Sequence, residues 1–230
     1  MNIAVILAGG KGLRFGGNIP KQMLQLGSKP VISWSVDTFH KIDLIDKIII
    51  VSEKNLTDII KKLYPENIYP KITAYAEGGK ERSDSSYNAL ESILFNEDDI
   101  ILFHDAARPF ISEDIIVKLI NTASITGAAG TYVRATDTVA LVNDMLIKSI
   151  PERDTVYSAQ TPQCFKYDII KKAHMINKKA PMKNVTDDIS LVVNMGADVA
   201  VIIGSNMNIK ITTELDMKFA EFLITAGHVC

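Results

Sequence analysis

The sequence predicts a doubly wound α/β domain built on a mostly parallel β-sheet. Three observations indicate this fold class: apolar β-rich runs recur along the 230 residues, helical patterns separate them, and no linker, low-complexity tract or internal repeat interrupts the alternation. The apolar runs are continuous, as expected of strands that are buried on both faces. With 47% hydrophobic and 23% charged residues, the chain is large enough to form one substantial core. We therefore expect a single domain over residues 1–230.

The expected strands and helices alternate in order along the chain. The strands are the apolar runs Ile3–Leu7, Ile45–Val51, Lys71–Tyr75, Asp99–Phe103, Gly130–Val133 and Val199–Ile203. Apolar residues at helical spacing predict helices at Pro30–Phe39, Asn55–Leu63, Glu81–Leu94, Ser112–Thr122, Tyr167–Met175 and Thr213–Ile224. Pro30 is tolerated in a first helical turn, and Thr213 with Asp216 resembles a capping box.

One stretch, from Asp137 to Tyr157, breaks this alternation. Short alternating segments at Thr138–Val142 and Leu146–Ile150 flank the turn Asn143-Asp144 and predict a β-hairpin. Such a hairpin projects from the domain as an arm at about residues 137–157 and leaves an edge and an apolar face to cover. We therefore expect a homodimer that forms through this arm.

Charge and cysteine content exclude several classes of protein. With 25 basic and 27 acidic side chains the net charge is −2, so nucleic acid and anionic lipid are not attracted overall, and a polyanionic ligand needs a local cluster of cations. Cys164 and Cys230 lack C-x-x-C spacing and read as plain thiols. No positive residue precedes the first apolar run, and no run approaches the roughly 18 residues needed to span a bilayer. The expected location is therefore the cytoplasm, with no membrane partner.

A glycine-rich loop follows the first expected strand. It reads Ala8-Gly9-Gly10-Lys11-Gly12-Leu13-Arg14-Phe15-Gly16-Gly17 and leads to Pro20-Lys21-Gln22. Glycines let a backbone approach a ligand closely and turn its N–H groups toward an anion. Phe15 stands where the dinucleotide fingerprint needs its third glycine, and no Walker pattern is present. Glycine content alone also fits a loop that binds nothing, but Arg14 and Lys21 could both reach one triphosphate.

Six blocks occur in order along the chain. They are the glycine loop with Pro20-Lys21-Gln22, Gly78-Gly79-Lys80-Glu81-Arg82-Ser83-Asp84-Ser85, His104-Asp105-Ala106-Ala107-Arg108-Pro109, Thr161-Pro162-Gln163, Thr186-Asp187-Asp188 and Asn208-Ile209-Lys210-Ile211-Thr212. In this order and spacing, they resemble the cytidylyltransferases that activate sugar-alcohol phosphates, acting on 2-C-methyl-D-erythritol 4-phosphate or ribitol 5-phosphate. The resemblance runs from Ile3 to about Leu223 and implies a Rossmann-like nucleotidyltransferase fold.

The resemblance implies a nucleotide site formed after the first and third strands. Its expected residues are Leu7, Ala8, Gly9, Gly10, Lys11, Gly12, Gly79, Lys80, Arg82, Ser85 and Ala106. A strand end followed by a helix start suits reading of a nucleobase edge by backbone groups and a serine hydroxyl. The structural alternative is that Ser83 or Ser85 only caps the helix. Lys80 stands where many family members carry Asp, so only its backbone is expected to contact the base.

For the polyol phosphate, the resemblance implies contacts from Asp105, Arg108, Thr138, Arg153 and Thr161. Period-two alternation sends His104 and Asp105 to opposite faces, and we expect Asp105 to face the ligand and His104 to be structural.

In the family, the residue matching Arg153 reaches the active site of the neighbouring subunit and binds the substrate phosphate. Without the resemblance, Arg153 would be interpreted as a solvent-exposed charge beside Glu152 and Asp154. Thr186, Asp187 and Asp188 are expected to cap the helix that runs through Leu191.

The expected reaction is Mg²⁺-dependent: CTP and a polyol phosphate give a CDP-polyol and pyrophosphate. The nucleophile is a substrate phosphate oxygen that is already ionised, so catalysis depends on orientation and charge neutralisation. By resemblance, the catalytic residues are Arg14, Lys21, Lys210 and Arg153. Mg²⁺ is expected on triphosphate oxygens and water, with no protein cage of carboxylates. Seven cations are expected to gather at one cleft: Lys11, Arg14, Lys21, Arg82, Arg108, Arg153 and Lys210.

Several alternatives to this reading remain. Methylerythritol phosphate, an isoprenoid precursor, is the favoured substrate, and ribitol phosphate is the alternative within the class. A non-catalytic nucleotide-binding module could use the same fold. A metal phosphohydrolase would need further ligands, but His40, His174 and His228 lack metal-ligand spacing. An NAD-dependent reductase is disfavoured because Ile50-Val51-Ser52 offers no acidic residue for the ribose.

Overall fold

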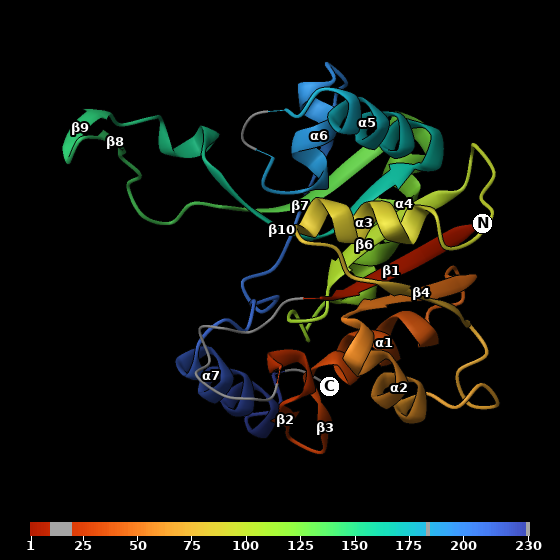
Figure 1. Ribbon diagram of the computed structural model, residues 1–230. Coiled ribbons are helices and arrows are strands. Elements are labelled where there is room, and N and C mark those ends of the chain that lie inside the picture. Colours follow the sequence, from red (N-terminus) through yellow and green to blue (C-terminus); the bar gives the residue numbers. More distant parts are fainter. Residues whose placement is uncertain (10–19, 183–184, 229–230) are drawn as a thin grey trace.

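The fold is a seven-stranded, mostly parallel sheet with helices on both faces (Figure 1). It is described by a computed structural model for residues 1–9, 20–182 and 185–228. The strand order is β11-β7-β10-β6-β1-β4-β5. The strands are β1 (Asn2–Ala8), β4 (Lys47–Ser52), β5 (Ile72–Glu77), β6 (Ile100–Asp105), β7 (Ala128–Arg134), β10 (Tyr157–Lys166) and β11 (Ala200–Ile203). All six expected strands are present, and the expected α/β fold class is confirmed.

Strand β10 was not expected from the sequence. It lies antiparallel between β6 and β7, whereas β1 pairs in parallel with β4 and β6. Its buried stretch includes Gln160, Thr161 and Gln163, so no continuous apolar run marks it. These polar side chains are satisfied by partners from distant parts of the chain, which the sequence pattern does not reveal.

The two faces of the sheet are covered by different helices. One face packs against α1 (Val31–Lys41), α2 (Lys54–Leu63) and α4 (Glu113–Thr126). The other face packs against α3 (Arg82–Leu90), α5 (Tyr167–Lys179) and α6 (Asp188–Asn194). Each helix contributes an apolar stripe to a core cluster, and strand residues such as Ile6 and Val5 alternate between the two clusters.

A smaller third cluster attaches the C-terminal helix α7 (Glu214–Thr225). Leu223 of α7 packs there with Leu26, which lies in the short strand β2 (Gln25–Leu26) paired with β3 (Lys29–Pro30). The expected capping box at the start of α7 is present, because Thr213 accepts from the backbone N–H of Asp216 at 3.2 Å. Within the described ranges, no helix is long and apolar enough to cross a membrane.

The expected hairpin is present as β8 (Leu141–Asn143) and β9 (Leu146–Ser149), and Figure 1 shows it at the end of a long arm that projects from the body. The turn lies one residue later than expected. Its central residues are Asp144 and Met145, with φ of 50° and 61°, because a tight turn between right-twisted strands needs two left-handed residues. Large apolar side chains on the arm are exposed in this chain: Val139, Leu141, Val142, Met145, Leu146, Ile147 and Ile150.

The connectivity creates a switch point beside β1. From β1 the chain moves outward to β4 and β5, and then returns to β6 on the other side of β1. In open α/β sheets, ligands bind at such a reversal, beyond the carboxyl ends of the strands.

Candidate active site

A cavity of about 680 Å³ lies at this carboxyl edge. It is bounded by residues that follow β1, β4, β5 and β6, by the start of α3 and by Lys210. Its lining residues are Leu7, Ala8, Gly9, Lys21, Gln22, Glu53, Lys54, Glu77, Gly78, Gly79, Lys80, Glu81, Arg82, Ser85, Asp105, Ala106, Ala107 and Lys210.

The cavity brings together most of the site residues expected from the sequence. Eleven of them line it: Leu7, Ala8, Gly9, Lys21, Gly79, Lys80, Arg82, Ser85, Asp105, Ala106 and Lys210. Gly10, Lys11, Gly12 and Arg14 lie outside the described residues. The lining does not include Arg108, Thr138, Arg153 or Thr161, although Arg108 and Thr161 lie directly behind Asp105.

The glycines after β5 allow a close approach to the start of α3. A Cβ on Gly79 would lie 2.1 Å from Cβ of Asp84, so any larger residue would displace the helix start. The backbone N–H of Gly79 donates to Oγ of Ser85 at 3.0 Å, and that hydroxyl lies 3.2 Å from the carbonyl oxygen of Glu81. These hydrogen bonds hold the loop and the Ser85 hydroxyl next to each other on the cavity wall.

Neither Ser83 nor Ser85 caps α3. The N-cap residue is Glu81, whose backbone N–H donates to Oδ2 of Asp84 at 3.0 Å in a capping box. The structural alternative considered for the two serines is therefore wrong. Ser85 instead lines the cavity with its hydroxyl held by Gly79.

A buried glutamine anchors the segment that carries Lys21. The side chain of Gln22 is only 2% exposed, and its Nε2 donates to the carbonyl oxygen of Ala8 at 2.6 Å. Lys21 begins the short 3₁₀ helix η2 (Lys21–Met23) and lines the cavity. Because Gln22 ties this helix to the end of β1, Lys21 is held at the switch point.

Asp105 lies between two cations at the end of β6. Nζ of Lys210 is 2.6 Å from Oδ2 of Asp105, and Nε of Arg82 is 3.3 Å from Oδ1. Burial alone would raise the pKa of Asp105, but Arg82 and Lys210 together outweigh it and hold the pKa well below its usual range. The carboxylate is therefore ionised at neutral pH and fixes the direction of both cations.

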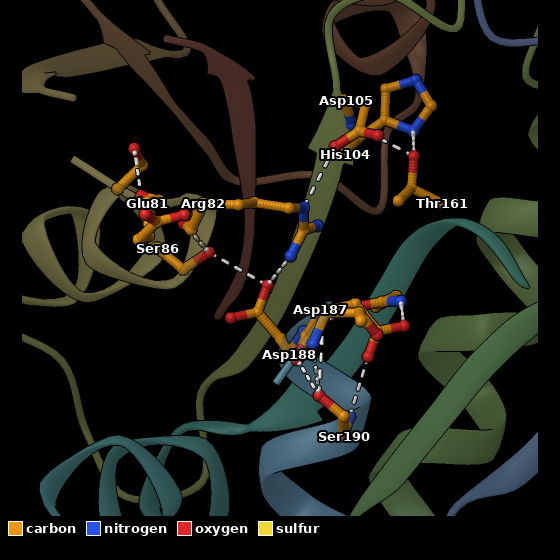
Figure 2. Close-up of polar contacts among 12 residues, drawn as sticks. Glu81, Arg82, Ser86, His104, Asp105, Thr161, Asp187, Asp188 and Ser190 are labelled. Atoms are coloured by element: carbon orange, nitrogen blue, oxygen red, sulfur yellow. Dashed lines mark hydrogen bonds and ion pairs between the residues drawn. The ribbon is translucent and has the colours of Figure 1, made fainter. Parts of the chain in front are cut away.

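Arg82 connects Asp105 to a second buried carboxylate, Asp188 (Figure 2). Nη1 of Arg82 lies 2.5 Å from Oδ2 of Asp188, which also accepts from the Ser86 hydroxyl at 2.9 Å. Nε2 of His174 lies 3.1 Å from the other oxygen of Asp188. Burial alone would raise the pKa of Asp188, but Arg82 and His174 more than compensate and keep it below its usual value.

The start of α6 shows which acidic residue caps it. Asp187 is the N-cap, and its Oδ1 accepts from the backbone N–H of Ser190 at 2.9 Å. The expectation of capping is confirmed for Asp187 and wrong for Asp188, whose fully buried carboxylate binds Arg82 instead. The sequence could not reveal this contact, because Arg82 and Asp188 lie 106 residues apart.

His104 and Thr161 lie behind Asp105, away from the cavity. His104 is fully buried and does not line the cavity, whereas Asp105 does, as the alternation along β6 predicts. Thr161 is 4% exposed, and its Oγ1 accepts from the backbone N–H of Asp105 at 3.1 Å. Its hydroxyl is thus committed to Asp105 and His104 (Figure 2).

Arg108 belongs to the same corner. Its Nη1 donates to the carbonyl oxygen of Asn208 at 2.7 Å, and its Nη2 to that of Ala159 at 3.4 Å. The backbone N–H of Ile211 donates to the carbonyl oxygen of Ala107 at 2.8 Å. These contacts tie the segment that carries Lys210 to the loop after β6.

Thr138 and Arg153 lie together on the arm. Nη2 of Arg153 donates to Oγ1 of Thr138 at 3.2 Å, and both side chains are exposed. Arg153 begins the short 3₁₀ helix η3 (Arg153–Thr155) at the base of the hairpin. Neither residue lines the cavity of its own chain, and Figure 1 shows the arm projecting from the body.

A cavity lined by glycines and lysines at the switch point of such a sheet is typical of α/β enzymes that bind phosphorylated ligands. The backbone and the Ser85 hydroxyl face one part of the cavity, and Lys21 and Lys210 supply positive charge to it. Comparison with known proteins identifies the family. The model of the IspD family, 2-C-methyl-D-erythritol 4-phosphate cytidylyltransferase, matches residues 2–226, and the chain belongs to this family of CTP-using enzymes.

Individual relatives agree over nearly the whole chain. The chain is 40% identical over 223 residues to the 2-C-methyl-D-erythritol 4-phosphate cytidylyltransferase of Clostridium perfringens, covering 96% of this chain and 98% of that protein. The Clostridium botulinum enzyme of the same name is 36% identical to this chain, and the match covers 97% of each protein.

Solved structures share the fold. The 4-diphosphocytidyl-2C-methyl-D-erythritol synthase of Anaerococcus prevotii superposes with a TM-score of 0.86 and 33% identity, covering 97% of this chain and 96% of the other. The 2-C-methyl-D-erythritol 4-phosphate cytidylyltransferase of Francisella tularensis gives a TM-score of 0.81 and 31% identity, and the match covers 96% of this chain and 98% of the other. The resemblance identified from the six sequence blocks is thereby confirmed.

Proposed function

We propose that the cavity transfers the cytidylyl group of CTP to 2-C-methyl-D-erythritol 4-phosphate and releases pyrophosphate. The observation that carries this proposal is the cavity itself, in which Gly79 and Ser85 face the same space as Lys21, Asp105 and Lys210. The relatives described above share this activity in their names, and nothing in them favours ribitol phosphate or a non-catalytic module.

The two substrates occupy different parts of the cavity in this proposal. The nucleoside of CTP lies against Gly79, Lys80 and Ser85, where backbone groups and a hydroxyl can bind a base or a ribose. The hydroxyls of the polyol lie at Asp105, because an ionised carboxylate accepts hydrogen bonds from them.

Catalysis then depends on orientation and on charge. A phosphate oxygen of the polyol phosphate attacks the α-phosphorus of CTP, the new oxygen–phosphorus bond forms, and the bond to the bridging oxygen of pyrophosphate breaks. The attacking oxygen is already ionised near neutral pH, so no general base is required. Lys21 stabilises the charge that develops on the leaving pyrophosphate, and Lys210 binds both the α-phosphate and the attacking phosphate. Asp105 orients the Lys210 ammonium for this task.

The described residues fit a Mg²⁺ ion that is held mainly by the substrate. In residues 1–9, 20–182 and 185–228, no group of three His, Cys, Asp or Glu side chains could hold a metal ion. Asp105 is already neutralised by Lys210 and Arg82. An ion bound to triphosphate oxygens and water suits the coordination of Mg²⁺ and would neutralise phosphate charge.

The arm supports a homodimer in which Arg153 acts in the neighbouring active site. Its apolar side chains are exposed on the hairpin, and a second copy could bury them. Arg153 and Thr138 lie outward on this arm rather than in the cavity of their own chain. In a dimer that exchanges arms, both would bind the phosphate of the polyol substrate in the partner's cavity.

The proposed activity is tested by measuring pyrophosphate release with CTP, Mg²⁺ and either methylerythritol phosphate or ribitol phosphate. We expect release with methylerythritol phosphate. Preferred turnover of ribitol phosphate would overturn the substrate assignment, and CTP binding without release from either substrate would indicate a binding module. Omission of Mg²⁺ should abolish release, and its restoration should recover it.

A further inference from the structure

His104 is a fully buried imidazole in which both nitrogens contact protein groups. Its Nε2 lies 3.0 Å from the carbonyl oxygen of Arg108, and its Nδ1 lies 3.2 Å from Oγ1 of Thr161. A carbonyl oxygen can only accept a hydrogen bond, so Nε2 carries the proton. Burial lowers the pKa of His104 to about 4, so the ring is neutral at pH 7 and Nδ1 has only a lone pair. The Thr161 hydroxyl therefore donates to Nδ1.

This assignment also fixes the role of the Thr161 oxygen. With its proton directed to His104, Oγ1 accepts from the backbone N–H of Asp105 at 3.1 Å. The hydrogen bonds run in one direction, from the Asp105 N–H through the Thr161 hydroxyl to His104, and from His104 Nε2–H to the Arg108 carbonyl. Both nitrogens of His104 and the Thr161 hydroxyl are thereby satisfied, and the two ends of the series lie on residues 105–108.

The loop held in this way carries Asp105 and Arg108, two of the five residues that the resemblance assigns to the polyol phosphate, together with Ala106 from the nucleotide set. Its backbone closes a turn in which the Arg108 N–H donates to the Asp105 carbonyl oxygen at 2.9 Å. The Ser35 hydroxyl donates to the Arg108 carbonyl oxygen at 3.1 Å, next to the bond from His104. Asn208 Nδ2 donates to the Thr161 carbonyl oxygen at 2.9 Å, which joins the segment before Lys210 to the same network.

We propose that His104 is a positioning residue for the polyol phosphate. It holds the Asp105–Arg108 loop in place through the Thr161 hydroxyl and the Arg108 carbonyl. This inference rests on the proposed function, because it assigns the loop to that substrate. The hydrogen bonds described for the nucleotide side run between Gly79, Ser85 and Glu81 and do not involve His104. Loss of the series should therefore affect the polyol phosphate more than CTP.

The tautomer can be tested without any assay of activity. In the protein labelled with ¹⁵N at histidine, the His104 ring should show a protonated Nε2 and an unprotonated Nδ1. Its resonances are assigned by their loss in His104→Phe or, if that variant does not fold, by through-bond correlation. This state should persist from neutral pH to mildly acidic pH. A protonated Nδ1 or a doubly protonated ring at neutral pH would overturn the proposal, whatever the outcome of the kinetics.

The functional role is tested by a pair of substitutions at Thr161. Thr161→Val keeps the branched shape but has no hydroxyl, whereas Thr161→Ser keeps the hydroxyl. For the valine variant we expect kcat/KM for methylerythritol phosphate to fall by about 10-fold or more through a higher KM for this substrate, the scale for a buried polar group left without its partner. The KM for CTP should be unchanged, and Thr161→Ser should restore most of the loss.

The outcomes separate this inference from the proposed function. If the wild type does not release pyrophosphate, the proposed function fails, while the tautomer experiment still decides the hydrogen-bond series. If Thr161→Val lowers only the folded fraction, the kcat of the reaction falls with neither KM changed, and the positioning role is refuted. Equal increases in the two KM values would refute it as well.

Discussion

Substitution of Gly79 by alanine tests the tight contact between the loop after β5 and the start of α3. A Cβ at this position would lie 2.1 Å from Cβ of Asp84 and 2.9 Å from its carbonyl carbon. Carbon atoms in contact lie about 3.5 Å apart or more, so the first separation is about 1.4 Å too short. Both atoms of Asp84 are fixed to the helix backbone, so the loop or the helix start must move.

The expected cost follows from this displacement. Overpacking of this kind costs about 1–3 kcal/mol. For a chain of this size, each kcal/mol lowers Tm by about 2–4 °C, so we expect a decrease of about 2–12 °C. Because the shift also moves Ser85 and the Gly79 backbone, kcat/KM for CTP should fall by as much as about 10²-fold, the effect of a displacement near 1 Å.

Gly78→Ala is the matched control for stability. A Cβ on Gly78 would meet nothing closer than 3.5 Å, with Cα of Gly9 and the carbonyl oxygen of Ser52 as its neighbours. Alanine there should leave Tm unchanged or raise it slightly, because it restricts the unfolded chain. Thermal unfolding and pyrophosphate release at varied CTP would measure both variants. Equal Tm values for the two, together with a wild-type KM for CTP in Gly79→Ala, would refute the steric reasoning.

Three further predictions concern the charged groups. Lys21→Ala should lower kcat by at least about 10²-fold, the scale for losing one preorganised charge stabiliser, and turnover near that of the wild type in a pyrophosphate-release assay would contradict its role. Arg153→Ala should raise KM for methylerythritol phosphate much more than KM for CTP, and equal changes would argue against an arm that binds the substrate phosphate. Asp105 has a depressed pKa in the folded state, so its stabilising effect is present in full above its unfolded pKa of about 3.9 and is lost as the pH falls toward the folded pKa. The difference in unfolding free energy between wild type and Asp105→Asn, measured in urea, should therefore be constant from about pH 5 to 8 and shrink only at lower pH. A difference that changes between pH 5 and 8 would show a raised pKa of Asp105 in the folded state, and a difference that stays constant below pH 4 would show an unshifted pKa; either result would contradict the pairing with Lys210 and Arg82.

The sheet was predictable because its strands are marked by local apolar pattern. Continuous runs such as the one in β1 are typical of parallel strands covered on both faces. The same criterion failed for β10, where buried Gln160, Thr161 and Gln163 interrupt the pattern. Their burial is possible only because partners from other elements satisfy them, and those partners are not visible in a local window.

The site was predictable in part for a related reason. Residues that follow parallel strands share one edge of the sheet, so the resemblance and the strand assignment together located Gly79, Asp105 and Lys21 on one cavity. Asp188 and Gln22 were missed as supporting residues. Asp188 has the sequence signature of a helix cap, and only its burial against Arg82 shows a different role.

The sequence by itself determined the alternation of strands and helices, the family blocks and the face of β6 that carries Asp105, because each depends on spacing along the chain. The tertiary structure alone decided which charged side chains pair and which ring nitrogen of His104 carries the proton. Those outcomes depend on burial and on groups brought together from distant segments, as when Lys210 reaches Asp105 and Thr161 reaches His104. Removal from water makes such contacts obligatory, since a buried polar group without a partner is costly.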